Sequence, residues 1–237
     1  MAPRLGLGLG RSRLEYVCWH NKYSAAFDGV NDHMTFDSGI NSILDVEVGT
    51  LSVWVKLQAT GGNTCIFKAS VNSNNNLELA YINSSQKIRY KYKAGGTNKF
   101  VDNAFAYEGN DTWYHLAMTW DTEADEFKAY LGSGQVGTTV GSLGTWSGSI
   151  SAVKVGINTL ADNQYWAGSI DNLALFNNVQ DIDKLYNNNK PADVTTFPGL
   201  VGNWRFEEGT GTSTVDKTGN KNTGHLINGA AFAADIP

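Results

Sequence analysis

The chain has 237 residues, of which 11% are aromatic, 17% are charged, 26 are Gly and only 4 are Pro. This length fits one large domain, and few charges with many Gly and aromatic residues favour short strands joined by tight turns over a helical bundle or a disordered chain. A formal net charge of −5 argues against a general nucleic-acid binder, and no apolar run is long enough to span a membrane.

The first 22 residues differ in composition from the rest of the chain. Arg4, Arg11 and Arg13 stand among Gly and Leu, and Gly interrupts the short apolar stretch at every second position. The stretch lacks the apolar core and the small-residue cleavage site of a secretory signal peptide, which predicts a product made in the cytoplasm. Because Gly offers no side chain for packing, we predict an extended arm over residues 1–22 that lies on another surface; a frayed terminus is the alternative.

Strand patterns begin after this arm. Residues 24–36 predict a strand, a turn and a second strand. Residues 51–58 follow a period of two, with apolar residues on one face (Leu51, Val53, Val55, Leu57) and Ser52, Trp54, Lys56 and Gln58 on the other. The same period of two predicts a hairpin formed by 77–82 and 86–92, with one buried and one solvated face. The strongest pattern of this kind is WYHLAMTW at residues 113–120.

The second half of the chain continues in short elements. We predict Gly-rich loops over 132–149, and one short helix over 180–187 because Ile182, Leu185 and Tyr186 follow helical spacing. Further strands are predicted at 152–157, 168–176, 199–206 and 224–232.

About a dozen short strands with almost no helix favour an all-β fold. We predict a two-sheet antiparallel jelly-roll sandwich with an extended N-terminal arm and one short helix. No second hydrophobic cluster follows a linker, so we predict one domain over 23–237, in which the segment 199–232 completes the sheets.

Paired carboxylates or a nucleophile with its base would indicate an enzyme. The acidic run Asp121, Glu123, Asp125 and Glu126 falls at a predicted hairpin turn, whereas a glycan-cleaving pair must face one groove. The four His residues are scattered, with no zinc-type pair and no nucleophile elbow. We therefore predict a protein without enzymatic activity, with a glycoside hydrolase as the least favoured alternative.

The cysteine pattern leaves two interpretations open. Cys18 and Cys65 are too few for a disulfide-framed scaffold and have no metal-ligand spacing. Two isolated thiols and one disulfide both fit the sequence.

Five segments together carry a family resemblance that covers most of residues 23–232. The chain resembles the laminin-G-like domains of the concanavalin A-like lectin and glucanase superfamily, which implies a concanavalin A-like sandwich. The segments are AAFDGVNDHMTF (25–36), GTLSVWVKL (49–57), TWYHLAMTWD (112–121), WAGSIDNLALFNNVQD (166–181) and LVGNWRFEEGTGTSTVDKTGNKNTGHLING (200–229).

The order of these segments departs from the family pattern. The stretch containing WRFEEG usually precedes the one containing FDGVND, and here it comes last. A circularly permuted connectivity or strand donation between neighbouring copies would each explain this order. The first 36 residues, with a Gly- and Leu-rich start before the FDG segment, also resemble virion structural proteins of tailed bacteriophages.

The resemblance implies a calcium site, because loops of related sandwiches converge on a structural ion. Ca²⁺ takes carboxylate, amide and carbonyl oxygens. We predict Asp32, Asp171 and Asp216 as ligands together with loop carbonyls; the alternative is that these side chains cap turns. Further oxygens are available from Asp28, Glu207 and Asn220.

Aromatic residues in loops are candidates for carbohydrate binding. Trp146, Tyr165 and Trp166 lie in or near Gly- and Asn-rich segments, where a ring could stack on a sugar beside polar groups. Core packing is the alternative for each of them.

The first function predicted from these features is a structural component of a phage virion, such as a capsid decoration, fibre or tail-associated protein. The arm with Arg4, Arg11 and Arg13 would bind other virion proteins, and the chain would self-associate as a homo-oligomer. The protein would be made in the host cytoplasm and act in the virion, with no nucleic-acid or membrane partner. The alternative is a carbohydrate-binding adhesin module that recognises surface glycans.

Overall fold

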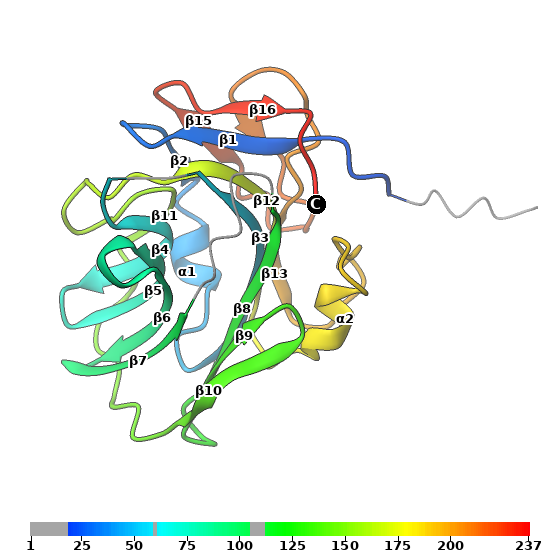
Figure 1. Ribbon diagram of the computed structural model, residues 1–237. Helices are drawn as coiled ribbons and strands as arrows, with labels where there is room; N and C mark the ends of the chain where they lie inside the picture. Colours follow the sequence, from blue (N-terminus) through cyan, green and yellow to red (C-terminus); the bar gives the residue numbers. More distant parts are fainter. Residues whose placement is uncertain (1–18, 59–60, 105–111) are drawn as a thin grey trace, which may run out of the picture.

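A computed structural model describes residues 19–58, 61–104 and 112–237 (Figure 1). It confirms the predicted two-sheet antiparallel sandwich: two sheets of eight strands each face one another, with the hydrophobic core between them. The arm residues Arg4, Arg11 and Arg13 lie outside the described residues. Among those described, no helix has the length and apolar character needed to cross a membrane.

The strands of the first sheet, called sheet A, follow the order β10-β9-β8-β3-β12-β1-β16, with β13 also paired to β12. Sheet A consists of β1 (Ser24–Asp28), β3 (Val48–Leu57), β8 (Tyr114–Asp121), β9 (Glu126–Leu131), β10 (Gly134–Val140), β12 (Ala167–Phe176), β13 (Leu200–Trp204) and β16 (Ala231–Ala233).

Sheet B follows the order β14-β15-β2-β11-β4-β5-β6-β7. It consists of β2 (His33–Phe36), β4 (Thr64–Asn72), β5 (Asn75–Ile82), β6 (Lys87–Ala94), β7 (Thr97–Ala104), β11 (Ala152–Val155), β14 (Ser213–Thr214) and β15 (Gly224–Ile227). The helical elements are α1 (Ile40–Ile43), the 3₁₀ turn η1 (Asn83–Ser85) and α2 (Ile182–Tyr186).

Strand β3 is buried on both of its faces. Its apolar residues face the core between the sheets, as their alternation predicts. Its other face is covered because α2 lies on the outer side of sheet A, where Tyr186 stacks on Trp54 with ring centroids 6.0 Å apart (Figure 1). A second apolar cluster forms beneath α2 from Ala117, Ala174, Phe176, Ile182, Leu185, Ala192 and Val194.

Helix α2 falls within the residues for which a helix is predicted. The Asp181 carboxylate accepts a hydrogen bond from the Asp183 N–H at 3.2 Å, which caps its first turn. Asn187 ends it in the left-handed conformation, with φ +48°.

The C-terminal strands complete both sheets within the one chain. Strand β13 pairs with β12, β15 pairs with β2, and the last strand β16 pairs with the first strand β1. The first and last strands are therefore neighbours, as circular permutation of the family order requires. In this chain the pairing needs no strand from a second copy.

The described cysteine is part of the core. Cys65 is fully buried, and its thiol donates to the carbonyl oxygen of Phe67 at 3.5 Å. Burial raises the pKa of this thiol above its usual range, which makes it a poor nucleophile. Cys18 lies outside the described residues, so the choice between isolated thiols and a disulfide stays open.

Candidate functional site

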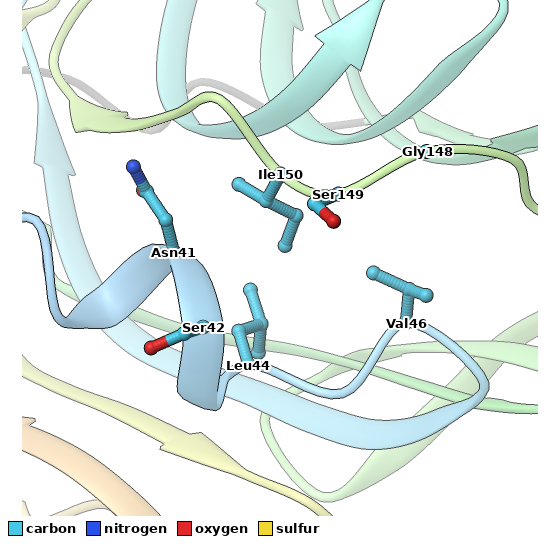
Figure 2. Close-up of a pocket in the computed structure, with 7 residues that line it drawn as sticks. All are labelled: Asn41, Ser42, Leu44, Val46, Gly148, Ser149 and Ile150. Carbon is cyan, nitrogen blue, oxygen red and sulfur yellow. The ribbon is translucent and has the colours of Figure 1, made fainter.

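A cavity of about 440 Å³ opens between α1 and the segment 148–150 (Figure 2). Leu44, Val46 and Ile150 direct aliphatic side chains toward it, and the Ser149 hydroxyl lies at its rim (Figure 2). The Asn41 amide donates to the carbonyl oxygen of Ser151 at 3.3 Å, which ties α1 to the opposite wall. The cavity therefore has apolar walls with polar groups at its edge, as ligand sites commonly do.

A second cavity, of about 250 Å³, is lined mainly by residues that are close in sequence to those of the first. Its lining residues continue the same two segments, with Glu47 following Val46 and with Thr145 and Trp146 preceding Gly148. We call the two cavities together the end groove, defined by their lining residues: Asn41, Ser42, Leu44, Val46, Glu47, Thr122, Gly144, Thr145, Trp146, Gly148, Ser149 and Ile150.

Trp146 is the half-buried aromatic residue of the end groove. Its indole N–H donates to the carbonyl oxygen of Gly148 at 3.1 Å, and its ring is tilted against Tyr92 with centroids 6.0 Å apart. The Asn75 side-chain oxygen accepts from the Ser147 N–H at 3.0 Å, which anchors this loop to β5. The ring is thus held in one orientation before any ligand arrives, which lowers the entropy lost on binding.

The other two predicted carbohydrate-binding residues lie elsewhere. The Tyr165 hydroxyl donates to the carbonyl oxygen of Asp162, and its ring is 6.4 Å from that of His33. Trp166 is fully buried in the core and offers no face to a ligand, so the prediction that it forms part of a sugar platform is wrong. Its neighbours in β12 are all buried, which explains why the indole turns inward.

The three aspartates predicted to hold calcium are all buried, each in its own hydrogen-bonded setting. Asp32 accepts a hydrogen bond from the Asp28 N–H at 3.0 Å. Both oxygens of Asp216 are engaged by backbone N–H groups of Asn203, Thr218 and Asn222 and by the Thr218 hydroxyl. Asp216 thus stabilises the turn that follows β14.

Asp171 is covered by residues 19–22, the first that the structure describes. Its carboxyl group accepts from the Asn21 amide at 2.6 Å and from the Asn172 N–H at 2.7 Å. Burial raises the pKa of Asp171 well above its usual range, which favours the neutral acid over the anion that a cation would require. The segment 19–22 closes this site, since the Lys22 N–H also donates to Glu207 and Trp19 stacks under the Arg205 guanidinium.

Two of the further residues predicted as calcium ligands form local hydrogen bonds instead. Asp28 accepts from the Val30 N–H, and the Asn220 amide donates to the carbonyl oxygen of Val201. No group of three or more His, Cys, Asp or Glu residues in the described part of the chain is arranged to hold a metal ion. Asp32, Asp171 and Asp216 therefore do not form one shared site in this structure, and calcium binding stays a prediction.

The residues with catalytic potential are engaged in structural contacts. Asp121 and Asp125 accept backbone N–H groups in and beside the turn between β8 and β9, and Glu126 pairs with Lys128. His115 is buried between a 2.8 Å contact to the Ser52 hydroxyl and a 3.0 Å contact to the Gly132 carbonyl. Because no carboxylate is among the hydrogen-bond partners of His115, this pair lacks the third member of a hydrolytic triad.

Of the residues that line the end groove, Trp146 is the one that its sequence context marks as a candidate. Leu44, Val46 and Ile150 carry no functional pattern in the sequence, and about a hundred residues separate the two walls. The one available signal was the position of Trp146 in a Gly-rich loop.

Comparisons with known proteins agree with this architecture. The sequence profile of Laminin_G_3, described as the concanavalin A-like lectin/glucanases superfamily, matches residues 28–181. Among solved structures, a candidate carbohydrate binding protein from Bacteroides ovatus is similar, with 14% identity, a TM-score of 0.66 and coverage of 91% of this chain. The alignment spans 60% of that protein's own chain.

Two further structures show the same fold. The CBM40 of the Ruminococcus gnavus IT-sialidase has 14% identity and a TM-score of 0.55, with 68% of this chain and 95% of that chain covered. A heptameric SAP-like pentraxin from Limulus polyphemus has 17% identity and a TM-score of 0.54, with coverage of 70% and 82%.

A search among curated proteins found no match to this sequence. The Laminin_G_3 match nevertheless covers more than half of the chain, and two eight-stranded antiparallel sheets are the expected architecture. The chain belongs to the Laminin_G_3 family of the concanavalin A-like lectin/glucanases superfamily.

Proposed function

We propose that this protein is a carbohydrate-binding module without enzymatic activity, and that its glycan binds in the end groove beside Trp146. The observation that carries the proposal is the half-buried indole of Trp146, which lines the second cavity and donates to Gly148 in the wall of the first. The lectin-like fold supports it, as does the carbohydrate-binding role suggested for the Bacteroides ovatus protein of similar structure.

The chemistry of the groove suits a sugar. A pyranose ring has an apolar face that stacks on an indole, and hydroxyls at its rim that need hydrogen-bond partners. Around Trp146 the groove offers the hydroxyls of Thr122 and Thr145 and the exposed carboxylate of Glu47. The aliphatic floor at Leu44 and Ile150 would take the apolar part of a neighbouring sugar unit.

Binding is favoured over cleavage by the acid groups of the groove. Both mechanisms of glycoside hydrolysis use two carboxyl groups flanking the bond to be broken. Glu47 is the single carboxylate among the described residues that line the two cavities.

A substitution at Trp146 tests the proposal. We expect Trp146→Ala to weaken binding to the best ligand in a panel of immobilised polysaccharides by about tenfold or more, because a stacking indole is a frequent hot spot. Trp113→Ala is the matched control: Trp113 is also partly buried, but its indole donates to Asp235, which follows β16 and lies outside the end groove. Equal binding by both variants, or no binding of the wild-type protein to any glycan, would refute the end groove as a sugar site.

The virion role has less support than the carbohydrate-binding alternative. Its proposed anchor, Arg4, Arg11 and Arg13, lies outside the described residues, and neither the family match nor the similar structures point to a virion. Virion partners, self-association and location in a virion stay predictions, which mass spectrometry of purified particles would test.

A further inference from the structure

The outer face of β4, β5, β6 and β7 is unusually basic for this chain. Residues directly opposite one another on paired strands share a face, and the core-facing residues of β5 and β6 are apolar, as is Val101 of β7. The opposite, outward face carries four cations on β6 and one on β4, against two carboxylates. They are Lys87, Arg89, Lys91, Lys93 and Lys68, against Glu78 and Asp102.

This face therefore has a formal charge of +3, whereas the whole chain has −5. Its two carboxylates neutralise some of the cations and leave others without a full counter-charge. Asp102 is fully engaged by Arg89 through two hydrogen bonds of 2.8 Å. Glu78 pairs with Lys68 and also lies 3.8 Å from Lys91, so that two ammonium groups share one carboxylate. Lys93 forms no ion pair with any residue that the structure describes.

An exposed aromatic ring lies beside these uncompensated charges. Phe100 is 44% exposed and stands directly opposite Lys91 across the β6–β7 pair. The Arg89 guanidinium lies 4.6 Å from the Phe100 ring centroid, which fixes the ring beside the cations. In the next outward-facing pair, the exposed Asn98 is opposite Lys93. A cation, a ring, an amide and a second cation thus form a compact quartet near the edge of sheet B.

We propose that this quartet, Lys91, Lys93, Asn98 and Phe100, binds an acidic polysaccharide through the carboxylates of its sugar units. The two ammonium groups pair with ring carboxylates, the Phe100 ring stacks on the apolar face of one sugar, and the Asn98 amide bonds to its hydroxyls. The formal charge of +3 and the exposed ring of this face together fit an anionic sugar polymer, which offers both carboxylates and apolar ring faces.

The quartet is separate from the end groove. Tyr92 lies between Lys91 and Lys93 in β6, and it points to the opposite side of the strand, where its ring meets Trp146. The two surfaces therefore lie on opposite sides of the same strand, and either can fail as a binding site without the other.

The test is the affinity of the full chain for polygalacturonate, with neutral dextran and dextran sulfate as the comparison polymers. We expect Lys91→Gln/Lys93→Gln to weaken binding to polygalacturonate roughly tenfold, and added salt to reduce this difference because the contacts are ionic. The matched control is Lys190→Gln/Lys221→Gln, which removes two exposed cations elsewhere and changes the net charge equally. It should bind as the wild type does.

Several outcomes would overturn the inference. Equal losses in the two double variants would mean that net charge alone attracts the polymer. Binding to dextran as tight as to polygalacturonate would remove the need for carboxylates, and preference for dextran sulfate would assign the face to another ligand. If Trp146→Ala abolishes polygalacturonate binding while Lys91→Gln/Lys93→Gln leaves it intact, the acidic glycan binds in the end groove. That result would refute this inference and leave the proposed function standing.

Discussion

Replacing Trp204 with alanine is expected to lower the free energy of unfolding by about 3–5 kcal/mol, the range typical of deleting a buried aromatic side chain. Trp204 is fully buried, and its ring packs on Phe36 with centroids 4.5 Å apart. Its indole N–H donates to the carbonyl oxygen of Asn222 at 2.7 Å, so the substitution also leaves a buried acceptor without its partner. The side chain comes from β13 and joins the C-terminal segment to the core between the sheets.

Urea unfolding of the wild type and the variant measures this effect. Trp113→Ala serves as the control because Trp113 is only partly buried, and we expect it to cost about 1 kcal/mol. If Trp204→Ala proves no more destabilising than Trp113→Ala, the C-terminal segment does not contribute to the core as described.

The second large effect is a loss of stability on acidification that depends on His115. Burial lowers the pKa of His115 to about 4 from an ordinary value of 6.5. In the unfolded chain the ring takes up a proton near pH 6.5, whereas the folded protein does not until about pH 4. The stability contributed by the neutral ring is therefore complete above pH 6.5 and is lost as the pH falls toward 4, by about 3 kcal/mol in total.

Two measurements isolate this contribution. The NMR titration of the His115 ring should show a midpoint near pH 4, and a midpoint near 6.5 would contradict the buried position. The difference in unfolding free energy between wild type and His115→Gln should shrink as the pH falls through this window. Comparing wild type with His115→Gln is necessary because Asp171, whose pKa is raised, changes the stability in the opposite direction. The neutral form of Asp171 stabilises the fold at low pH, and this stability is lost as the pH rises.

Alternation along single strands made much of the fold predictable. The pattern at 51–58 and 113–120 corresponds closely to β3 and β8, and helical spacing located α2. Strand β10 was missed because Gly and Thr in GQVGTTV show no apolar alternation, and its predicted assignment to a Gly-rich loop is corrected. It lies at the edge of sheet A and is held by pairing with β9 on one side, so its side chains need not be buried.

Features that depend on tertiary contacts could not be predicted in this way. Alternation along β3 does not show what covers its outer face: Trp54 is buried beneath Tyr186 of α2, and Ser52 is buried in contact with His115. The walls of the end groove are remote from one another in the chain, and no local pattern brings Val46 to Ile150.

The basic face beside Phe100 was predictable in part from the sequence. Alternation predicts correctly that Lys87, Arg89 and Lys91 share the solvated side of their strand. Which carboxylates neutralise these cations depends on how β6 pairs with β5 and β7. The structure shows that Lys68 and Lys91 share Glu78, and that Lys93 has no ion pair among the described residues. Uneven compensation, rather than the number of cations, is what indicates an anionic ligand.

The most direct test of the account is an NMR titration of the seven Trp indole N–H signals with the polysaccharide fragment that binds best. We expect the Trp146 signal to shift with ligand concentration, because its ring borders the end groove. The signals of the fully buried Trp54, Trp120, Trp166 and Trp204 should stay in place. A saturable shift confined to Trp146 would place the glycan in the end groove, whereas an unmoved Trp146 signal under saturating ligand would contradict the proposed site.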